Sequence, residues 1–104
     1  MPAKPSPSPE PLYLVLGQIP HGRLCSYGQL ATLAGYPGQA RWVGRLLGKL
    51  PNDSRLPWHR VVNAQGKISF PVGSPAYHRQ LSRLIAEGSA DHNGKLLWRQ
   101  RVWP

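Results

Sequence analysis

Residues 26–50, SYGQLATLAGYPGQARWVGRLLGKL, decide the fold, because they hold two short helical patterns joined by a Pro-Gly turn. Ser26 and Gln29 have the spacing of a capping box, which predicts that a helix begins at Ser26. Gly35 is a residue that readily ends such a helix, and Pro37-Gly38 predicts a tight turn after it. This arrangement is typical of a helix-turn-helix, a motif that many proteins use to bind DNA.

The second helical pattern, from about Gln39 to Leu50, separates an apolar side from a basic side. We expect four apolar side chains to pack in the core: Val43, Leu46, Leu47 and Leu50. Three basic residues recur every four positions on the opposite side: Arg41, Arg45 and Lys49. The basic stripe favours contact with DNA phosphates. The alternative is a surface helix whose cations simply face water.

Shorter patterns on either side complete one small domain. The spacing of apolar residues predicts a helix over 12–19, which Pro20 ends, and another from Ser74-Pro75 to Gly88. Val61-Val62 indicates a short buried strand, and residues 68–70 are expected to return as a second strand before Pro71.

The two ends of the chain differ in composition from this domain. Residues 1–11 contain five prolines, which predicts a disordered, proline-rich tail and places the folded domain at 12–104. Residues 94–104 alternate apolar and basic residues and predict a short strand or an ordered tail. Its tryptophans are expected to attach the tail to the core, with nucleic-acid contact as the alternative.

The charge of the chain indicates an anionic partner. Thirteen Lys and Arg stand against four Asp and Glu, a net charge of +9, which favours nucleic acid. A ribosome-associated or merely soluble basic protein is the alternative. The single cysteine, Cys25, excludes an internal disulfide and favours the cytoplasm. No apolar stretch is long enough to span a membrane, and the scattered histidines predict neither a metal nor a cofactor. We expect a monomer.

Several short motifs, in this order, resemble those of the O6-alkylguanine-DNA alkyltransferases. They are IPHGR at 19–23, SYGQLA at 26–31, ARWVG at 40–44, PWHRV at 57–61 and AEG at 86–88. The resemblance covers about residues 12–88. It implies a small, mainly helical α/β domain with a winged-helix-like helix-turn-helix, as in the DNA-binding domain of those enzymes.

Residue 58 departs from the family pattern. The family has a cysteine there that takes the alkyl group from the damaged base, whereas this chain has Trp58. An indole does not form the thiolate that attacks carbon. The chain thus resembles the alkyltransferase-like proteins, and the resemblance implies a protein that is not an enzyme, that binds O6-alkylguanine in double-stranded DNA by flipping the nucleotide, and that marks the damage for nucleotide excision repair proteins.

The resemblance also implies a role for individual residues. Arg41 enters the base stack in place of the flipped nucleotide, and Tyr27, Trp58 and Val61 border the extruded base. The residues expected to contact DNA around them are Ser26, Gln29, Gln39, Ala40, Arg45 and Lys49. The family's proton relay is matched by His59, Arg60 and Glu87, which without a thiol are expected to serve as scaffold.

Two other functions and one departure remain open at this point. The chain could be a sequence-specific helix-turn-helix regulator, or an alkyltransferase that uses another acceptor. Phe70 and Pro71 stand where the family has small or polar pocket residues, which leads to the hypothesis that the pocket accepts larger adducts.

Overall fold

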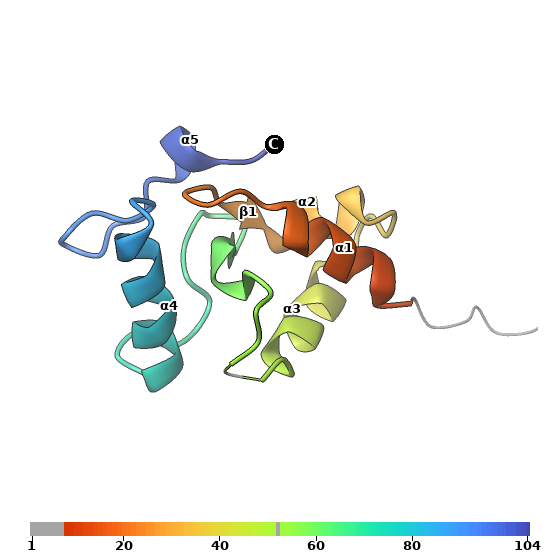
Figure 1. Ribbon diagram of the computed structural model, residues 1–104, viewed down its shortest axis with the longest axis horizontal. Coiled ribbons are helices and arrows are strands. Elements are labelled where there is room, and N and C mark those ends of the chain that lie inside the picture. Colours follow the sequence, from red (N-terminus) through yellow and green to blue (C-terminus); the bar gives the residue numbers. More distant parts are fainter. Residues whose placement is uncertain (1–7, 52) are drawn as a thin grey trace, which may run out of the picture.

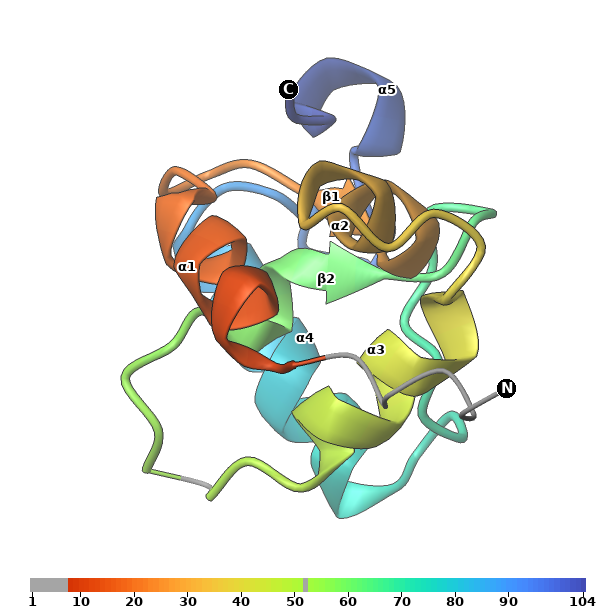
Figure 2. The same ribbon diagram turned by 90° about the vertical axis from the view of Figure 1, so that its right-hand side faces the viewer.

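The computed structural model describes residues 8–51 and 53–104; residues 1–7 of the expected tail lie outside them. Five α-helices, one 3-10 helix and two strands make up this part of the chain. Figures 1 and 2 show how they are arranged in space. In chain order they are α1 (Glu10–Gln18), β1 (Cys25–Ser26), α2 (Tyr27–Leu33), α3 (Ala40–Gly48), η1 (Trp58–Arg60), β2 (Val61–Val62), α4 (Pro75–Ala86) and α5 (Trp98–Arg101).

The predicted helix-turn-helix is confirmed as α2 and α3. The Ser26 hydroxyl accepts a hydrogen bond from Gln29 N at 3.1 Å, and the Gln29 side chain accepts one from Ser26 N at 3.0 Å, so the capping box is complete. Gly35 takes a left-handed conformation with φ +90° after α2. On α3, Val43 is fully buried while Arg41 and Arg45 are exposed, as is Lys49 directly after the helix.

Helix α1 begins two residues before the predicted boundary. The prediction that the disordered tail reaches residue 11 is therefore wrong for Glu10 and Pro11, which form the first turn of α1. A proline is tolerated at this position because the first turn of a helix has no acceptor for its missing N–H. Leu12 and Leu16 then bury the inner face of the helix completely.

The strand pairing differs from the prediction. Val61-Val62 does form a strand, but its partner is β1, in parallel, with Cys25 opposite Val61 and Ser26 opposite Val62. The expected return strand over 68–70 is not formed. Instead, the Asn63 side chain accepts hydrogen bonds from Gln65 N and Lys67 N and closes a tight turn. Ile68 then packs into the core with Val62 and Leu84, but residues 68–70 form no strand.

Two hydrophobic clusters hold the domain together. The first lies among α1, α2, α3 and the strands, and includes Leu12, Leu16, Ile19, Cys25, Leu30, Ala31, Val43 and Val61. The second joins α4 to the C-terminal segment and includes Leu24, Val62, Ile68, Leu84 and Ala90. Each fully buried Leu or Val contributes on the order of 1.5–3 kcal/mol by leaving water.

The C-terminal segment is attached to the core through its tryptophans, as predicted. Trp103 packs against the first cluster and Trp98 against the second. The segment contains the short helix α5 and an isolated bridge rather than a regular strand: Leu24 N donates to Arg101 O at 2.8 Å, and Trp103 N donates to Leu24 O at 2.7 Å. Figure 2 shows α5 at the opposite end of the molecule from α3.

Within residues 8–51 and 53–104, no helix has the length and apolar character needed to cross a membrane. The same residues contain no group of three or more His, Cys, Asp or Glu side chains placed to hold a metal ion.

Candidate functional site

An open cleft of about 550 Å³ lies between the helix-turn-helix and the loop that follows β2. One wall comes from the start of α2 and α3 and the other from residues 63–64 and 69–71. The cleft is lined by Ser26, Tyr27, Gly28, Ala40, Arg41, Gly44, Asn63, Ala64, Ser69, Phe70 and Pro71. Four of the residues predicted from the sequence therefore meet here, namely Ser26, Tyr27, Ala40 and Arg41. We call this space the helix-turn-helix cleft.

Tyr27 is positioned by the first turn of α2, directly after the capping serine. Its side chain is half-buried and packs against the first core cluster. Burial raises the pKa of its hydroxyl, and a hydrogen bond with the Ser69 side chain opposes that rise. The phenol is therefore neutral near pH 7 and presents an aromatic ring and a hydrogen-bonding group together.

The other DNA-binding residues predicted from the sequence lie around the cleft on the helix-turn-helix. Gln39, Arg41, Arg45 and Lys49 are exposed. Gln29 uses its side-chain oxygen in the capping box, which leaves its amide N–H groups available. Gly44 lies between Arg41 and Arg45 and has open space where a Cβ would stand. No side chain therefore projects from α3 at this point of the cleft.

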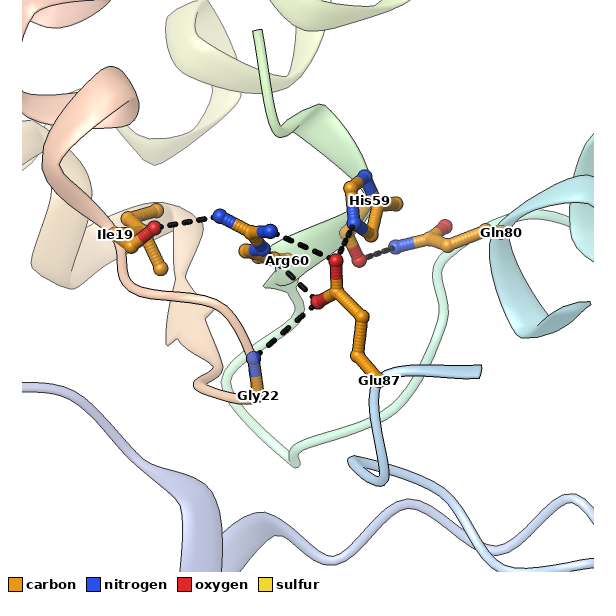
Figure 3. Close-up of polar contacts among 6 residues, drawn as sticks. All are labelled: Ile19, Gly22, His59, Arg60, Gln80 and Glu87. Carbon is orange, nitrogen blue, oxygen red and sulfur yellow. Dashed lines mark hydrogen bonds and ion pairs between the residues drawn. The ribbon is translucent and has the colours of Figure 1, made fainter. Parts of the chain in front are cut away.

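A hydrogen-bond network joins η1 to the end of α4 (Figure 3). Glu87 accepts from Arg60 Nε at 2.9 Å and Nη2 at 2.7 Å, and its Oε2 lies 2.8 Å from His59 Nε2. It also accepts from Gly22 N at 3.4 Å. Arg60 Nη1 donates to Ile19 O at 2.7 Å. Burial acts to raise the pKa of Glu87, but the hydrogen bonds from Arg60 and His59 lower it to about 2.

The structure thus brings together the three residues of the predicted relay. Burial lowers the pKa of His59, partly offset by the hydrogen bond to Glu87, so the imidazole is neutral near pH 7. With Nε2 bonded to Glu87, the buried Nδ1 of His59 has no partner within the described part of the chain. It is the free end of the network.

Gln80 is a residue of this site that the sequence prediction missed. It is almost fully buried, with 1% of its surface exposed, and its Nε2 donates to His59 O at 3.0 Å and to Val61 O at 2.9 Å. One amide group therefore holds both ends of the segment 59–61. The available signal was its position between Tyr77 and Leu84 on the apolar face of α4.

Trp58 and Val61 are not among the residues that line the helix-turn-helix cleft. The Trp58 ring is half-buried, makes an edge contact with His59, and has the Arg83 guanidinium 5.2 Å from its centroid. The Val61 side chain is fully buried and its carbonyl accepts from Gln80. The structure therefore places Trp58 beside α4, outside the helix-turn-helix cleft that Tyr27 and Arg41 line.

Comparison with known proteins assigns the chain to a family. The family described as 6-O-methylguanine DNA methyltransferase, DNA binding domain, matches residues 9–89. The chain belongs to this family. The match covers the helix-turn-helix, η1 and α4, and so includes both walls of the helix-turn-helix cleft and the Glu87 network.

Two proteins that resemble this chain over most of their own length are named as a base-flipping protein and as an alkyltransferase-like protein. A DNA base-flipping protein of Vibrio parahaemolyticus is 46% identical, over 88% of this chain and 91% of its own. Alkyltransferase-like protein 1 of Schizosaccharomyces pombe is 39% identical, over 74% of this chain and 71% of its own. The alkyltransferase-like proteins are therefore relatives of this chain within the family.

A solved structure supports the same relationship. The crystal structure of S. pombe Atl1 in complex with damaged DNA containing O6-carboxymethylguanine superimposes with a TM-score of 0.79 and 34% identity, covering 91% of this chain and 93% of that one. The fold predicted from the resemblance, a small helix-rich domain like the alkyltransferase DNA-binding domain, is confirmed. Proteins named methylated-DNA–protein-cysteine methyltransferase also match, but over shorter stretches.

Proposed function

We propose that this protein binds O6-alkylguanine in double-stranded DNA, holds the damaged nucleotide outside the duplex, and transfers no alkyl group. The observation that carries the proposal is Trp58, which stands directly before the intact His59–Glu87 network and which the motif resemblance aligns with the family's cysteine. The names and the DNA complex of the relatives support lesion binding.

The first step is attraction to the phosphate backbone. The net charge of +9 provides it, together with the exposed cations Arg41 and Arg45 on α3 and Lys49 directly after it. Such contacts release counterions, so affinity falls as salt rises, and they carry no sequence information.

The second step is extrusion of the nucleotide. Arg41 and Tyr27 lie on the same cleft, and each supplies a flat group that stacks on bases. A guanidinium that fills the emptied stack offsets part of the few kcal/mol, roughly, that unstacking costs. Tyr27 provides a ring against which the extruded nucleotide rests.

The third step, alkyl transfer, has no acceptor. Trp58 provides no thiolate, and the one cysteine of the chain, Cys25, is fully buried in β1. Burial raises the pKa of its thiol to about 12, so it stays protonated and unreactive near pH 7. We propose that the lasting complex is then the signal for nucleotide excision repair proteins.

A competition experiment tests this function. Two duplexes that differ only by one O6-methyl group compete for the protein at fixed salt. The proposal predicts at least about tenfold preference for the methylated duplex, worth about 1.4 kcal/mol. Equal affinity for both, together with a strong preference for one undamaged sequence, would instead support a sequence-specific regulator.

A further inference from the structure

A second cavity lies on the other side of the 63–72 loop. It has a volume of about 340 Å³ and is closed by the loop, by the first turn of α4 and by residues 94–98. Its lining shares no residue with that of the helix-turn-helix cleft. Residues 65–68 and 72 line this second cavity, which we call the rear pocket, whereas 63–64 and 69–71 line the cleft.

The inside of the rear pocket is apolar. Ile68, Tyr77, Leu96 and Trp98 form its walls, and all four belong to or pack against the second core cluster. Gly66 fits the loop closely to the indole, because a Cβ built at this residue would lie 2.6 Å from Trp98 Cγ. The pocket is therefore a packed and specific shape rather than a gap between loops.

The mouth of the rear pocket is left uncovered. Val72 lies at its edge and is 86% exposed, more than any other large apolar side chain in the described part of the chain. Figure 1 shows the 90–97 loop on the outer side of α4, away from α3. A molecule in the rear pocket would thus approach from a side that leaves the outer face of α3 free.

The rim of the rear pocket is cationic. Lys67 and Lys95 both line it and are exposed, and within residues 8–51 and 53–104 neither forms a salt bridge. The acid nearest to Lys95 in the chain, Asp91, uses its Oδ1 to accept from Asn93 N and Lys95 N at 2.9 Å, which fixes the turn. No acidic residue lines the pocket.

We infer that the rear pocket binds an aromatic side chain of an acidic polypeptide segment on a partner protein. A volume of about 340 Å³ is near the lower end of ligand cavities, roughly 300–1,000 Å³, and suits one large side chain. Aromatic anchors seated in pockets supply much of the affinity of protein interfaces. The two lysines complement carboxylates on either side of such an anchor.

The charge alone would also attract DNA, but the one base that the proposed function takes out of the stack is held in the helix-turn-helix cleft, and the other bases of the duplex stay stacked. Because the two cavities have separate linings, the partner segment and damaged DNA can be bound together. The 63–72 loop forms a wall of both, and any effect of one ligand on the affinity for the other must be reciprocal.

Titration of the ¹⁵N-labelled protein with the acetylated and amidated peptide EDEFED, followed by NMR, tests this inference. We expect saturable shifts of the Gly66, Ile68 and Leu96 amides and of the Trp98 indole. The peptide EDEAED, which lacks the anchor, should bind at least about tenfold more weakly. The same shifts should occur when a duplex with one O6-methylguanine is already bound.

Paired charge reversals provide the matched control. Lys67→Glu with Lys95→Glu should lower the affinity for EDEFED at least about tenfold. Arg45→Glu with Lys49→Glu lowers the net charge equally, but these residues lie on α3 and at its C-terminal end, and the pair should change the affinity for EDEFED less than about threefold. Three results would overturn the inference: no saturable shifts, equal binding of EDEAED, or undamaged duplex DNA alone shifting the Trp98 indole and the amides around it.

Discussion

His59 Nε2 and Glu87 Oε2 lie 2.8 Å apart, although the residue before His59 is Trp58 and offers no thiol for this pair to activate. Arg60 donates to the same carboxylate and also to Ile19 O, so the network joins α1, η1 and the end of α4. Its remaining role is structural, because it fixes the short segment that leads into β2.

Replacing Glu87 with Gln should destabilise the fold by about 3 kcal/mol, because the partly buried Arg60 guanidinium loses its only anionic partner among the described residues. Urea unfolding followed by circular dichroism measures the change. Glu10→Gln, at an exposed residue of the first turn of α1, is the matched control and should cost less than about 0.5 kcal/mol. Equal effects of the two substitutions would contradict a structural role for the network.

Acid should weaken the fold through the same network. The folded pKa of Glu87 is about 2 against an ordinary value of 4.5, so the unfolded chain binds the proton first. The stabilisation is complete above pH 4.5 and is lost as the pH falls toward 2. The pKa of His59 is also lower in the folded protein than its ordinary value of 6.5, so below pH 6.5 the unfolded chain takes up this proton first and the fold loses stability. In urea unfolding between pH 4.5 and pH 2, where Glu87 takes up its proton, the difference in stability between wild type and Glu87→Gln should narrow as the pH falls. A difference in stability that widens toward pH 2 would show that the pKa of Glu87 is not lowered in the folded protein.

Arg41 and Lys49 should affect DNA binding in different ways. Arg41 lines the helix-turn-helix cleft, whereas Lys49 follows α3 outside it. Arg41→Ala should weaken binding to a duplex with O6-methylguanine about 10- to 100-fold, with a smaller loss for undamaged DNA. Lys49→Ala should weaken both equally and reduce the salt slope by about one. Fluorescence anisotropy at several salt concentrations measures both, and identical behaviour of the two variants would remove the special role of Arg41.

Substitutions at Gly66 and Gly38 distinguish the cost of lost packing from the cost of backbone strain. Both are left-handed, with φ +74° and +80°, but only a Cβ at Gly66 would collide with Trp98, while Gly38 has open space. Gly38→Ala should cost about 1 kcal/mol, from strain alone. Gly66→Ala should cost at least about 2 kcal/mol, since the loop must also move away from the indole. Urea unfolding compares them; similar costs would mean that Trp98 is not packed on the loop.

The helices of this molecule were predictable where their ends are set by residues close in the chain. The capping residues Ser26 and Ser74 and the left-handed Gly35 each act within one turn of the chain, so the helices beside them follow from sequence. The basic stripe of α3 and the partners of the relay were likewise found by spacing and resemblance.

The rest depends on contacts between distant segments. The pairing of Cys25 with Val61, the amide of Gln80 on two carbonyls of η1 and β2, and Arg83 over Trp58 all join residues that no local pattern connects. The expected strand over 68–70 failed for the same reason, since β2 pairs with the distant β1 and Ile68 is buried among residues of several segments, including Leu24 and Leu84.

The central claim is that recognition of the lesion occurs without transfer. Mixing the protein with an equal amount of a duplex that contains O6-methylguanine, isolating the complex, and then measuring the intact mass of the protein and the O6-methylguanine content of the DNA tests it most directly. The account predicts an isolable complex, an unchanged protein mass and a fully retained lesion. A protein heavier by one methyl group, with guanine restored in the DNA, would contradict it.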